Sequence, residues 1–215
     1  HMAVCALAWG SSFLFIKMIG PAMPPVHLAT ARGAFAALAV GLTLAAMRQW
    51  PLPRVEEIAP WAIIGLLNGA IPNTLVAYAM QRMDSGPAVL IQSVGPLFTT
   101  IAAHCLFADE RLNAQSATGV LVGLLGVGLL IGPEAGAGAA TLPAVLAMLG
   151  VALCYTLGNL YTRTVRHHHP LRLAMGQQLF SAIIAGVLAL ALGGAAAFAG
   201  AGDHLPSLIA LGVVC

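Results

Sequence analysis

The chain has 215 residues, and its composition and charge together place it in a lipid bilayer. Hydrophobic residues make up 60% of it and charged residues 7%, with a mean hydropathy of +0.92, whereas a soluble domain has roughly 25% charged residues. This composition excludes a soluble fold, a secreted disulfide scaffold, a disordered tail and a nucleic-acid binder that works through a basic face. A net charge of +2 is too small to imply an acidic partner.

The apolar runs predict membrane-spanning helices in chain order. Their approximate bounds are 3–20, 26–47, 59–80, 86–107, 114–132, 142–163, 171–193 and 205–215. A span needs about 20 residues, so the last run is too short to cross. Prolines, glycines and charged residues separate the runs, as is typical of helix breaks. The sequence therefore predicts an all-α polytopic membrane protein with about seven spans and part of an eighth.

Charged residues in the predicted loops indicate the orientation. An excess of Lys and Arg marks the cytoplasmic side of a membrane protein. If the amino terminus is cytoplasmic, the outside loops hold Arg82 alone, and the inside loops hold Arg48, Arg54, Arg111, Arg163, Arg166 and Arg172. Abundant alanine, with arginine far in excess of lysine, is typical of a GC-rich bacterial genome. We therefore expect a multi-pass protein of the bacterial inner (plasma) membrane with a cytoplasmic amino terminus.

Two stretches of the chain resemble each other at an offset of about 145 residues. Residues 8–17 resemble residues 154–163, and the alanine-rich helix after Pro25 resembles the helix after Pro170. Five predicted spans fit within this offset, and an odd number of spans turns the second copy upside down in the membrane. Inverted repeats are typical of secondary transporters, which bind their solute near the midplane between the copies.

This reading divides the chain into two repeats. The first five-helix repeat covers residues 1–133, and an incomplete second, inverted repeat covers residues 142–215. The complete fold would be a ten-helix inverted-repeat (5+5) transporter. The chain is then expected to be a truncated form of it.

The fourth predicted span carries a stripe of candidate site residues. Gln92, Pro96, Thr100 and His104 recur every four residues, so they share one helix face. Polar side chains in hydrocarbon are costly unless they face a partner or water. The stripe therefore either lines a solute cavity or forms hydrogen bonds between helices. Pro96 removes one backbone hydrogen bond and predicts a kink, which serves gating or is purely structural.

Other spans offer further polar and aromatic candidates. Asn68 and Tyr78 lie in the third span. Asn68 and Pro72 share a face, whereas Asn73 is rotated by about 100° from Pro72. Aromatic and hydroxyl residues of the first span have counterparts in the sixth, at symmetry-related positions, although Trp and Tyr also serve as interfacial anchors. The predicted substrate-binding residues are Trp9, Ser12, Asn68, Tyr78, Gln92, Thr100, Tyr155 and Asn159.

The few charged residues near spans allow two interpretations. Lys17 and Arg32 lie near the outer ends of the first two spans, from which both could snorkel to the boundary. Lys17 could instead contact a solute, and we include it with Pro96 as a gating residue. Glu57 falls in a predicted loop, and Arg172 belongs to a solvated basic loop beside the histidines at 167–169. No acidic residue lies well inside a predicted span, which argues against a buried carboxylate as proton carrier.

Neither the cysteines nor the histidines indicate a metal or cofactor. The four cysteines lie in separate apolar runs without CxxC spacing, at Cys5, Cys105, Cys154 and Cys215, and inert buried thiols are the expected state. Three adjacent histidines cannot all face one ion. We expect no catalytic residue, no metal and no cofactor.

Several motifs, in their order and spacing, resemble the EamA-type transporters of the drug/metabolite transporter superfamily. They are Trp9-Gly10-Ser11-Ser12-Phe13 with Lys17, Ala31-Arg32, Tyr78-Ala79-Met80-Gln81, Gly95-Pro96-Leu97-Phe98, Asp109-Glu110-Arg111-Leu112 and the glycines from Gly119 to Gly128. The resemblance covers residues 8–132 strongly and 142–215 weakly. It implies a ten-helix inner-membrane carrier of two inverted repeats that commonly exports amino acids or other small metabolites.

We therefore expect a transporter rather than an enzyme. Its solute would be a small neutral or zwitterionic metabolite, such as an amino acid, exported by alternating access, because amides, hydroxyls and aromatics offer hydrogen bonds without a strong fixed charge. The partners would be the solute and the lipid bilayer, with no nucleic acid and with a homodimer as one option. The alternative is a membrane-embedded enzyme acting on lipid or isoprenoid substrates, which would need clustered acids or histidines for metal and phosphate.

Overall fold

The computed structural model describes residues 2–50, 52–106, 115–129 without 116, 120, 124 and 127, 141–165 and 169–214. These residues are mainly helical and contain no β-strand. The Asp109-Glu110-Arg111-Leu112 motif and two of the three adjacent histidines lie outside the described residues.

The helices follow the predicted apolar runs closely. They are α1 Met2–Ile19, α2 Pro25–Ala46, α3 Val55–Gly65, α4 Ile71–Met80, α5 Ser85–Gln92, α6 Gly95–Leu106, α8 Leu142–Thr164, α9 Pro170–Gly193 and α10 Leu205–Val214, with the short turns η1 Gly20–Ala22, η2 Leu66–Ala70 and η3 Ala195–Ala201. Five segments of the described chain are long and apolar enough to cross a membrane: Pro25–Ala46, Val55–Met80, Ser85–Leu106, Leu142–Thr164 and Pro170–Gly193.

Prolines begin two of these helices and lie beside irregular turns in others. Pro25 and Pro170 begin α2 and α9, where the missing N–H costs no hydrogen bond and the fixed φ favours the helix. Pro72 follows η2, a π-helical turn within the Val55–Met80 segment. The predicted interruption near Pro96 is present, because α5 ends at Gln92 and α6 begins at Gly95.

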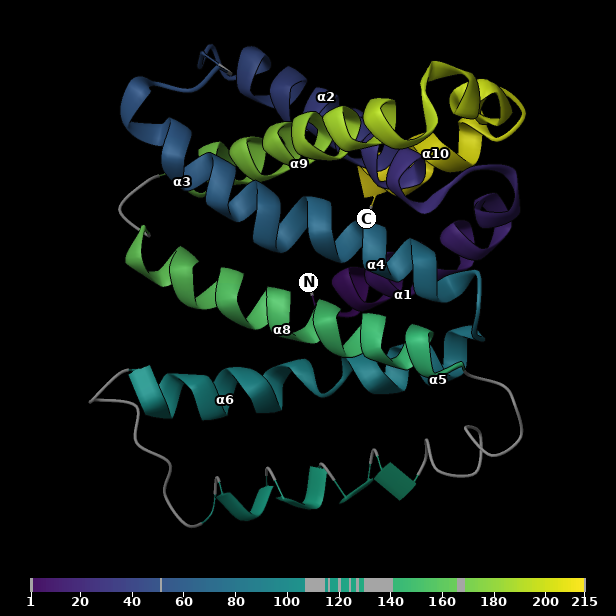
Figure 1. Ribbon diagram of the computed structural model, residues 1–215. Coiled ribbons are helices and arrows are strands. Elements are labelled where there is room, and N and C mark those ends of the chain that lie inside the picture. Colours follow the sequence, from purple (N-terminus) through teal and green to yellow (C-terminus); the bar gives the residue numbers. More distant parts are fainter. Residues whose placement is uncertain are drawn as a thin grey trace.

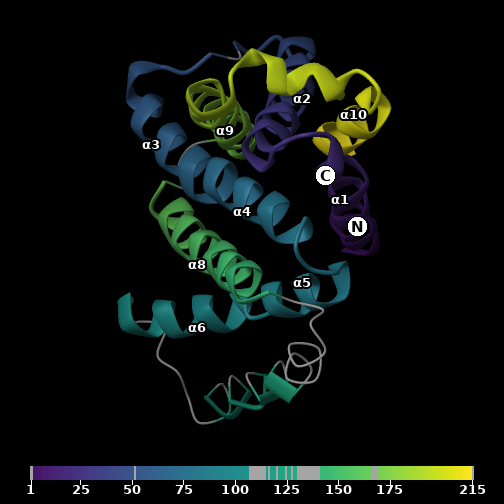
Figure 2. The ribbon, with the colours of Figure 1, turned by 45° about the vertical axis from the view of Figure 1, so that its right-hand side comes forward.

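The described helices are arranged around two main pairs, α2 with α9 and α4 with α8. Helices α2 and α9 lie side by side (Figures 1 and 2), and the continuous segment of α3, η2 and α4 packs against both α9 and α8. Helix α8 in turn lies between α4 and the α5–α6 segment, whereas α10 packs on α2 and α1. The helices of the first four predicted spans and the later helices therefore interdigitate rather than form two separate bundles.

Contacts between α2 and α9 are reciprocal about the offset of 145 residues. A methyl group added at Gly41 would lie 3.5 Å from the Met175 Cε atom, and one at Gly186 would lie 3.3 Å from the Thr30 Cγ2 atom. Adding 145 to residues 41 and 30 gives 186 and 175, so each contact is the repeat counterpart of the other. Reciprocal contacts of this kind are typical of an interface between two surfaces related by a two-fold axis.

Arg172 holds one end of the α2–α9 pair. Its guanidinium donates to the backbone carbonyls of Trp50 (2.6 Å) and Leu52 (3.1 Å), in the loop after α2. It also forms an ion pair with Glu57, including a 2.7 Å hydrogen bond from Nε to Oε1, and lies over the Trp61 ring. The predictions that Arg172 and Glu57 lie in solvated loops are therefore wrong, because each neutralises the other in a buried pair.

His27 occupies the equivalent place at the opposite end. Like Arg172 in α9, it is the third residue of its helix, and its Nε2 lies 3.2 Å from the carbonyl oxygen of Gly194, just after α9. Gly194 has φ +66°, a left-handed conformation that favours glycine and ends the helix. The His27 and Phe198 rings meet edge-on, with their centroids 4.6 Å apart. His27 is 1% exposed.

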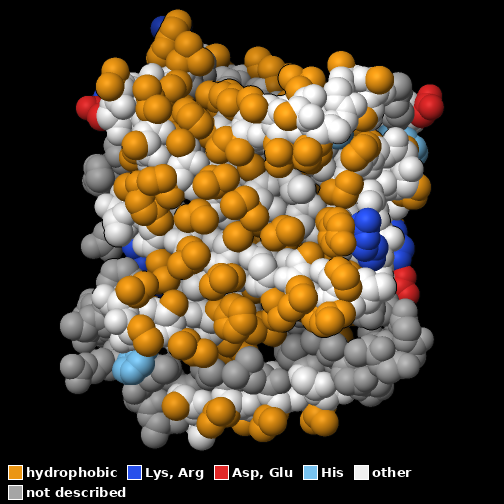
Figure 3. All heavy atoms as spheres, viewed as in Figure 1, with side chains coloured by type: hydrophobic (Ala, Val, Ile, Leu, Met, Phe, Trp, Pro, Cys, Tyr) orange, Lys and Arg blue, Asp and Glu red, His pale blue; other side chains and the backbone are white. Residues whose placement is uncertain are grey.

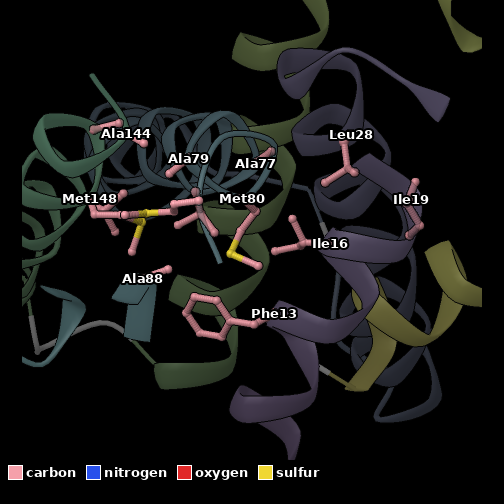
Figure 4. Packing of buried hydrophobic residues seen from close by; sticks show 14 of the residues in the cluster. Phe13, Ile16, Ile19, Leu28, Ala77, Ala79, Met80, Ala88, Ala144 and Met148 are labelled. Carbon is pink, nitrogen blue, oxygen red and sulfur yellow. The ribbon is translucent and has the colours of Figure 1, made fainter. Parts of the chain in front are cut away.

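The largest apolar core fills the end of the bundle at which α1 and α4 terminate. Figure 4 shows Phe13 and Ile16 of α1 gathered with Met80 of α4 and Met148 of α8. Residues of α2, α5 and α10 join the same cluster. Because these side chains are buried together, they seal this end of the bundle.

The outer surface matches a lipid environment. Hydrophobic side chains cover much of the face in Figure 3, and Lys, Arg, Asp and Glu lie toward the margins where the helices end. Large exposed side chains include Leu42 of α2 and Val187 of α9. An apolar surface of this extent is costly in water and favourable in hydrocarbon.

Candidate functional site

A cavity of about 710 Å³ lies between α1, η2, α5, α6, α8 and α9. This volume is in the usual range for small-molecule sites. The cavity, called the central cavity below, is lined by Trp9, Gly10, Phe13, Asn68, Val89, Gln92, Ser93, Pro96, Tyr155, Asn159 and Gln177. Six predicted site residues are among them: Trp9, Asn68, Gln92, Pro96, Tyr155 and Asn159.

An aromatic pair forms one wall of the central cavity. The rings of Trp9 and Tyr155 meet edge-on, with centroids 6.0 Å apart and planes at 60°, an arrangement that aromatic quadrupoles favour. Trp9 is 52% exposed, so it can contact a molecule in the cavity as well as Tyr155. The two residues are the aromatic counterparts in the sequence repeat, and the fold brings them together.

Two buried amide oxygens border the same space. The Oδ1 atom of Asn68 and the Oε1 atom of Gln92 have no hydrogen-bond partner within the described chain. A buried acceptor left unpaired costs about 1–3 kcal/mol, and native structures contain few of them. Both residues line the central cavity, so their amides are candidates for hydrogen bonding to a bound solute.

A separate void of about 10 Å³, room for about one water, lies beside the central cavity and reaches Arg32. It shares Trp9, Phe13, Gln92 and Tyr155 with the cavity and adds Ser12, Ile16, Arg32 and Val76. Ser12 is 5% exposed, so the seventh predicted site residue is buried beside the cavity.

Arg32 points into the bundle rather than to the membrane boundary. Its Nη1 donates to the Asn73 Oδ1 atom of α4 at 3.2 Å. Among the described residues no charged side chain lines the central cavity, and Arg32 borders only the small void beside it. Asn73, which lies on a different face of its helix from Asn68, provides the amide partner of Arg32 inside the bundle.

Three predicted site residues, Tyr78, Thr100 and Lys17, are not part of the central cavity lining. Tyr78 lies under Arg82, whose guanidinium is 3.8 Å from the ring centroid. Thr100 donates to the Pro96 carbonyl at 2.8 Å and faces outward. The interrupted helix explains its position, since Gln92 and Thr100 belong to different helices, α5 and α6.

Lys17, the predicted gating residue, lines a separate surface pocket of about 860 Å³ with the α1–α2 and α4–α5 turns. Its Nζ forms an ion pair with Asp84. The Gln81 side chain crosses the same gap and donates to the carbonyl of Gly20 at 2.7 Å. These contacts tie the two turns together, and the buried core separates them from the central cavity.

Two polar residues of the lining are absent from the predicted site, Ser93 after α5 and Gln177 of α9. The second is the more informative. A signal was present, because Gln177 and Gln178 are adjacent amides in an otherwise apolar helix. Buried amides in a span are costly without a partner or water, which marks such a pair for attention. Phe13 and Val89 also line the cavity, but nothing distinguishes them from core residues in the sequence.

The comparisons with known proteins agree with this architecture. An uncharacterized transporter of Bacillus subtilis (strain 168), YoaV, is 25% identical over 163 residues, which are 75% of this chain and 56% of that protein. The chain thus spans little more than half of that relative's length. A solved structure, described only as a crystal structure of a protein, matches with a TM-score of 0.64 at 20% identity over 97% of this chain and 74% of its own, which shows a shared fold.

The family comparison is the most specific of these findings. The model of the EamA-like transporter family matches residues 2–132, more than half of the chain. This range contains α1 to α6 and most of the central cavity lining. The protein is therefore a member of the EamA-like transporter family.

Proposed function

We propose that this protein carries small neutral or zwitterionic metabolites, amino acids among them, across the bacterial inner membrane by alternating access. The central cavity is the observation that carries the proposal. It is a space of about 710 Å³ within membrane-spanning helices, bordered by amides and an aromatic pair. Family membership makes transport a better reading than catalysis, and export is the direction that the family resemblance implies.

The groups around the cavity fit the two poles of a zwitterion. Arg32 lies beside the cavity, next to Ser12 in a void of about 10 Å³, and its positive charge favours a carboxylate in the cavity. The Asn68 and Gln92 side chains line the cavity, and their amides can hydrogen-bond to the solute. The Trp9 and Tyr155 rings offer faces to a cation or to an apolar side chain.

The reciprocal contacts support the inverted-repeat arrangement that many alternating-access transporters have. The α2–α9 interface pairs Gly41 with Met175 and Gly186 with Thr30, as expected if residues 1–133 and 142–215 are copies related by a two-fold axis in the membrane plane. In such transporters the two copies rock about a site between them. The buried core at the Lys17 end fits a conformation closed on that side.

Counterflow of labelled amino acids into proteoliposomes of the full-length protein tests the proposal. We expect exchange by the wild type and a loss of roughly tenfold in Asn68→Ala and Gln92→Ala, the value of about 1.4 kcal/mol of binding. Thr100→Ala, a polar change outside the cavity, is the matched control and should exchange normally. Unaltered exchange in both cavity variants would remove these amides from the solute pathway.

The orientation of reconstitution tests export. Vesicles with the amino terminus outside expose the cytoplasmic face to added solute, on the assignment made from the loop arginines. Net export predicts uptake into these vesicles, and uptake confined to the opposite orientation would contradict it.

A further inference from the structure

The Asn68 side chain rests on a glycine of the neighbouring helix. A methyl group added at Gly158 of α8 would overlap the Asn68 Oδ1 atom and lie 2.5 Å from its Cγ atom. Gly158 is buried, and it is not itself among the residues of the cavity lining. The amide of Asn68 therefore lies between the α8 backbone on one side and the central cavity on the other.

The backbone that carries Asn68 cannot move away from α8. Asn68 belongs to the π-helical turn η2, whose other side touches α9. A methyl group at Gly65 would lie 2.6 Å from the Phe180 Cβ atom, and one at Gly69 would lie 2.5 Å from the Ser181 Cβ atom. Because η2 is already in close contact with α9, a larger residue at position 158 has to be accommodated by the Asn68 side chain.

Stability alone does not explain this arrangement. The Asn68 Oδ1 atom packs against Gly158 without a hydrogen-bond donor in the described chain, and a buried acceptor in that state is unfavourable. An apolar side chain would fill the same place at lower cost. Glycine at position 158 instead leaves room for the Asn68 amide between the α8 backbone and the central cavity.

We infer that Gly158 is a positioning residue that sets the depth of the central cavity by holding the Asn68 amide back against α8. The inference rests on the proposed function, since it concerns the selection of the same solutes. A side chain at position 158 pushes the amide into the cavity and removes space of about the size of that group. Large solutes then lose more binding than small ones, and Gly158 limits the size of the solute.

The test compares Gly158→Ala with Gly150→Ala in the full-length protein. Gly150 lies two turns earlier in α8, and a methyl group there would meet only the flexible Leu75 side chain, at 3.2 Å. Counterflow is measured with alanine and with phenylalanine. We expect Gly158→Ala to raise the KM for phenylalanine about tenfold, the low end of the effect of one methylene group in a pocket, with little change for alanine. Gly150→Ala should resemble the wild type for both.

A second comparison uses Asn68→Ser, alone and combined with Gly158→Ala. In Asn68→Ser the amide is absent, so adding Gly158→Ala should cause no further change in the ratio of the two KM values. This comparison remains valid even if Gly158→Ala alone fails to fold, since the shorter side chain removes the overlap. A further loss for phenylalanine in the double variant would overturn the inference.

The outcomes separate the inference from the function on which it rests. Absence of exchange by the wild type with any amino acid contradicts the proposed function. Exchange by the wild type, with an equal ratio of KM values in Gly158→Ala and Gly150→Ala, contradicts the role of Gly158 and leaves the transport proposal intact.

Discussion

At one end of the α2–α9 pair, the third residue of α9 reaches the loop after α2, and at the other end the third residue of α2 reaches the loop after α9. The first is Arg172, which donates to two carbonyls and pairs with Glu57. The second is His27, which contacts one carbonyl, at Gly194, and the Phe198 ring. The third residue of each helix thus belongs to a charged network at one end and makes a single carbonyl contact and a ring contact at the other.

This difference predicts unequal stiffness at the two ends. The Arg172 and Glu57 side chains are 12% and 4% exposed, so their pair is little screened by water or salt. The His27 end has no comparable buried pair among the described residues, and its ion pair, Lys17 with Asp84, is 44% and 72% exposed. We expect conformational change to concentrate at the His27 end and the Arg172 end to act as the pivot.

The largest expected effect is at Arg172. Arg172→Met leaves the Glu57 carboxylate, which is 3% exposed, buried without its counter-ion. Removing one partner of a buried pair costs about 3–5 kcal/mol, so the variant should unfold at a much lower temperature or denaturant concentration in detergent. Arg54→Ala is the control, because Arg54 and Glu56 form an exposed pair, at 73% and 70%. Equal losses in the two variants would contradict a pivot at Arg172.

A smaller loss is expected at His27. His27→Ala removes one neutral hydrogen-bond contact and one edge-on aromatic contact, each worth about 1 kcal/mol. The predicted destabilisation of about 2 kcal/mol is measured by the same unfolding assay. His27→Phe keeps the ring contact and should recover part of it. If His27→Ala cost as much as Arg172→Met, the two ends would be equivalent and the comparison would fail.

Glycine substitutions inside the α2–α9 interface should have smaller effects than changes at either end. Gly41→Ala places a methyl group at an ordinary contact distance, 3.5 Å from the flexible Met175, and should stabilise the helix by about 0.5–1 kcal/mol. Gly186→Ala meets Thr30 at 3.3 Å, a β-branched side chain that is stiff in a helix, and should gain less. Unfolding of both variants checks the order, and a larger gain for Gly186→Ala would contradict it.

The smallest effect is expected at the exposed ion pair. Lys17→Met removes the Lys17–Asp84 pair, which should cost less than about 1 kcal/mol. The loss should shrink further as salt rises from 0.05 to about 0.5 M, because the Debye length falls. A salt-independent loss above this size would show that the His27 end is held as firmly as the other.

Most of the fold could be predicted from the sequence, because span length and apolar runs reflect local composition. Five predicted runs correspond to the five candidate spans. The start of the third was wrong by about four residues, since α3 begins at Val55 and the acidic residues after it suggested a loop. Glu57 is tolerated in the helix because Arg172, 115 residues away, pairs with it, and no local pattern announces that contact.

The site could be predicted only in part, for a similar reason. Polarity within apolar spans was enough to find Asn68, Gln92 and Asn159. Helix periodicity then failed where the helix is irregular: the break after Gln92 separates it from Thr100. The inward direction of Arg32 depends on Asn73 across the α2–α4 contact, which single-helix reasoning does not show.

The length of the Val55–Met80 segment has a consequence for the lipid around the protein. A helix of 26 residues with a rise of about 1.5 Å per residue is about 39 Å long, although the hydrocarbon layer is only about 30 Å thick. The excess is taken up by tilt or by ends that reach the headgroups. Since the π-helical turn with Asn68 lies at the middle of this segment, bilayer thickness acts on the angle at which Asn68 meets α8. We expect exchange rates to vary with the acyl-chain length of the vesicle lipids.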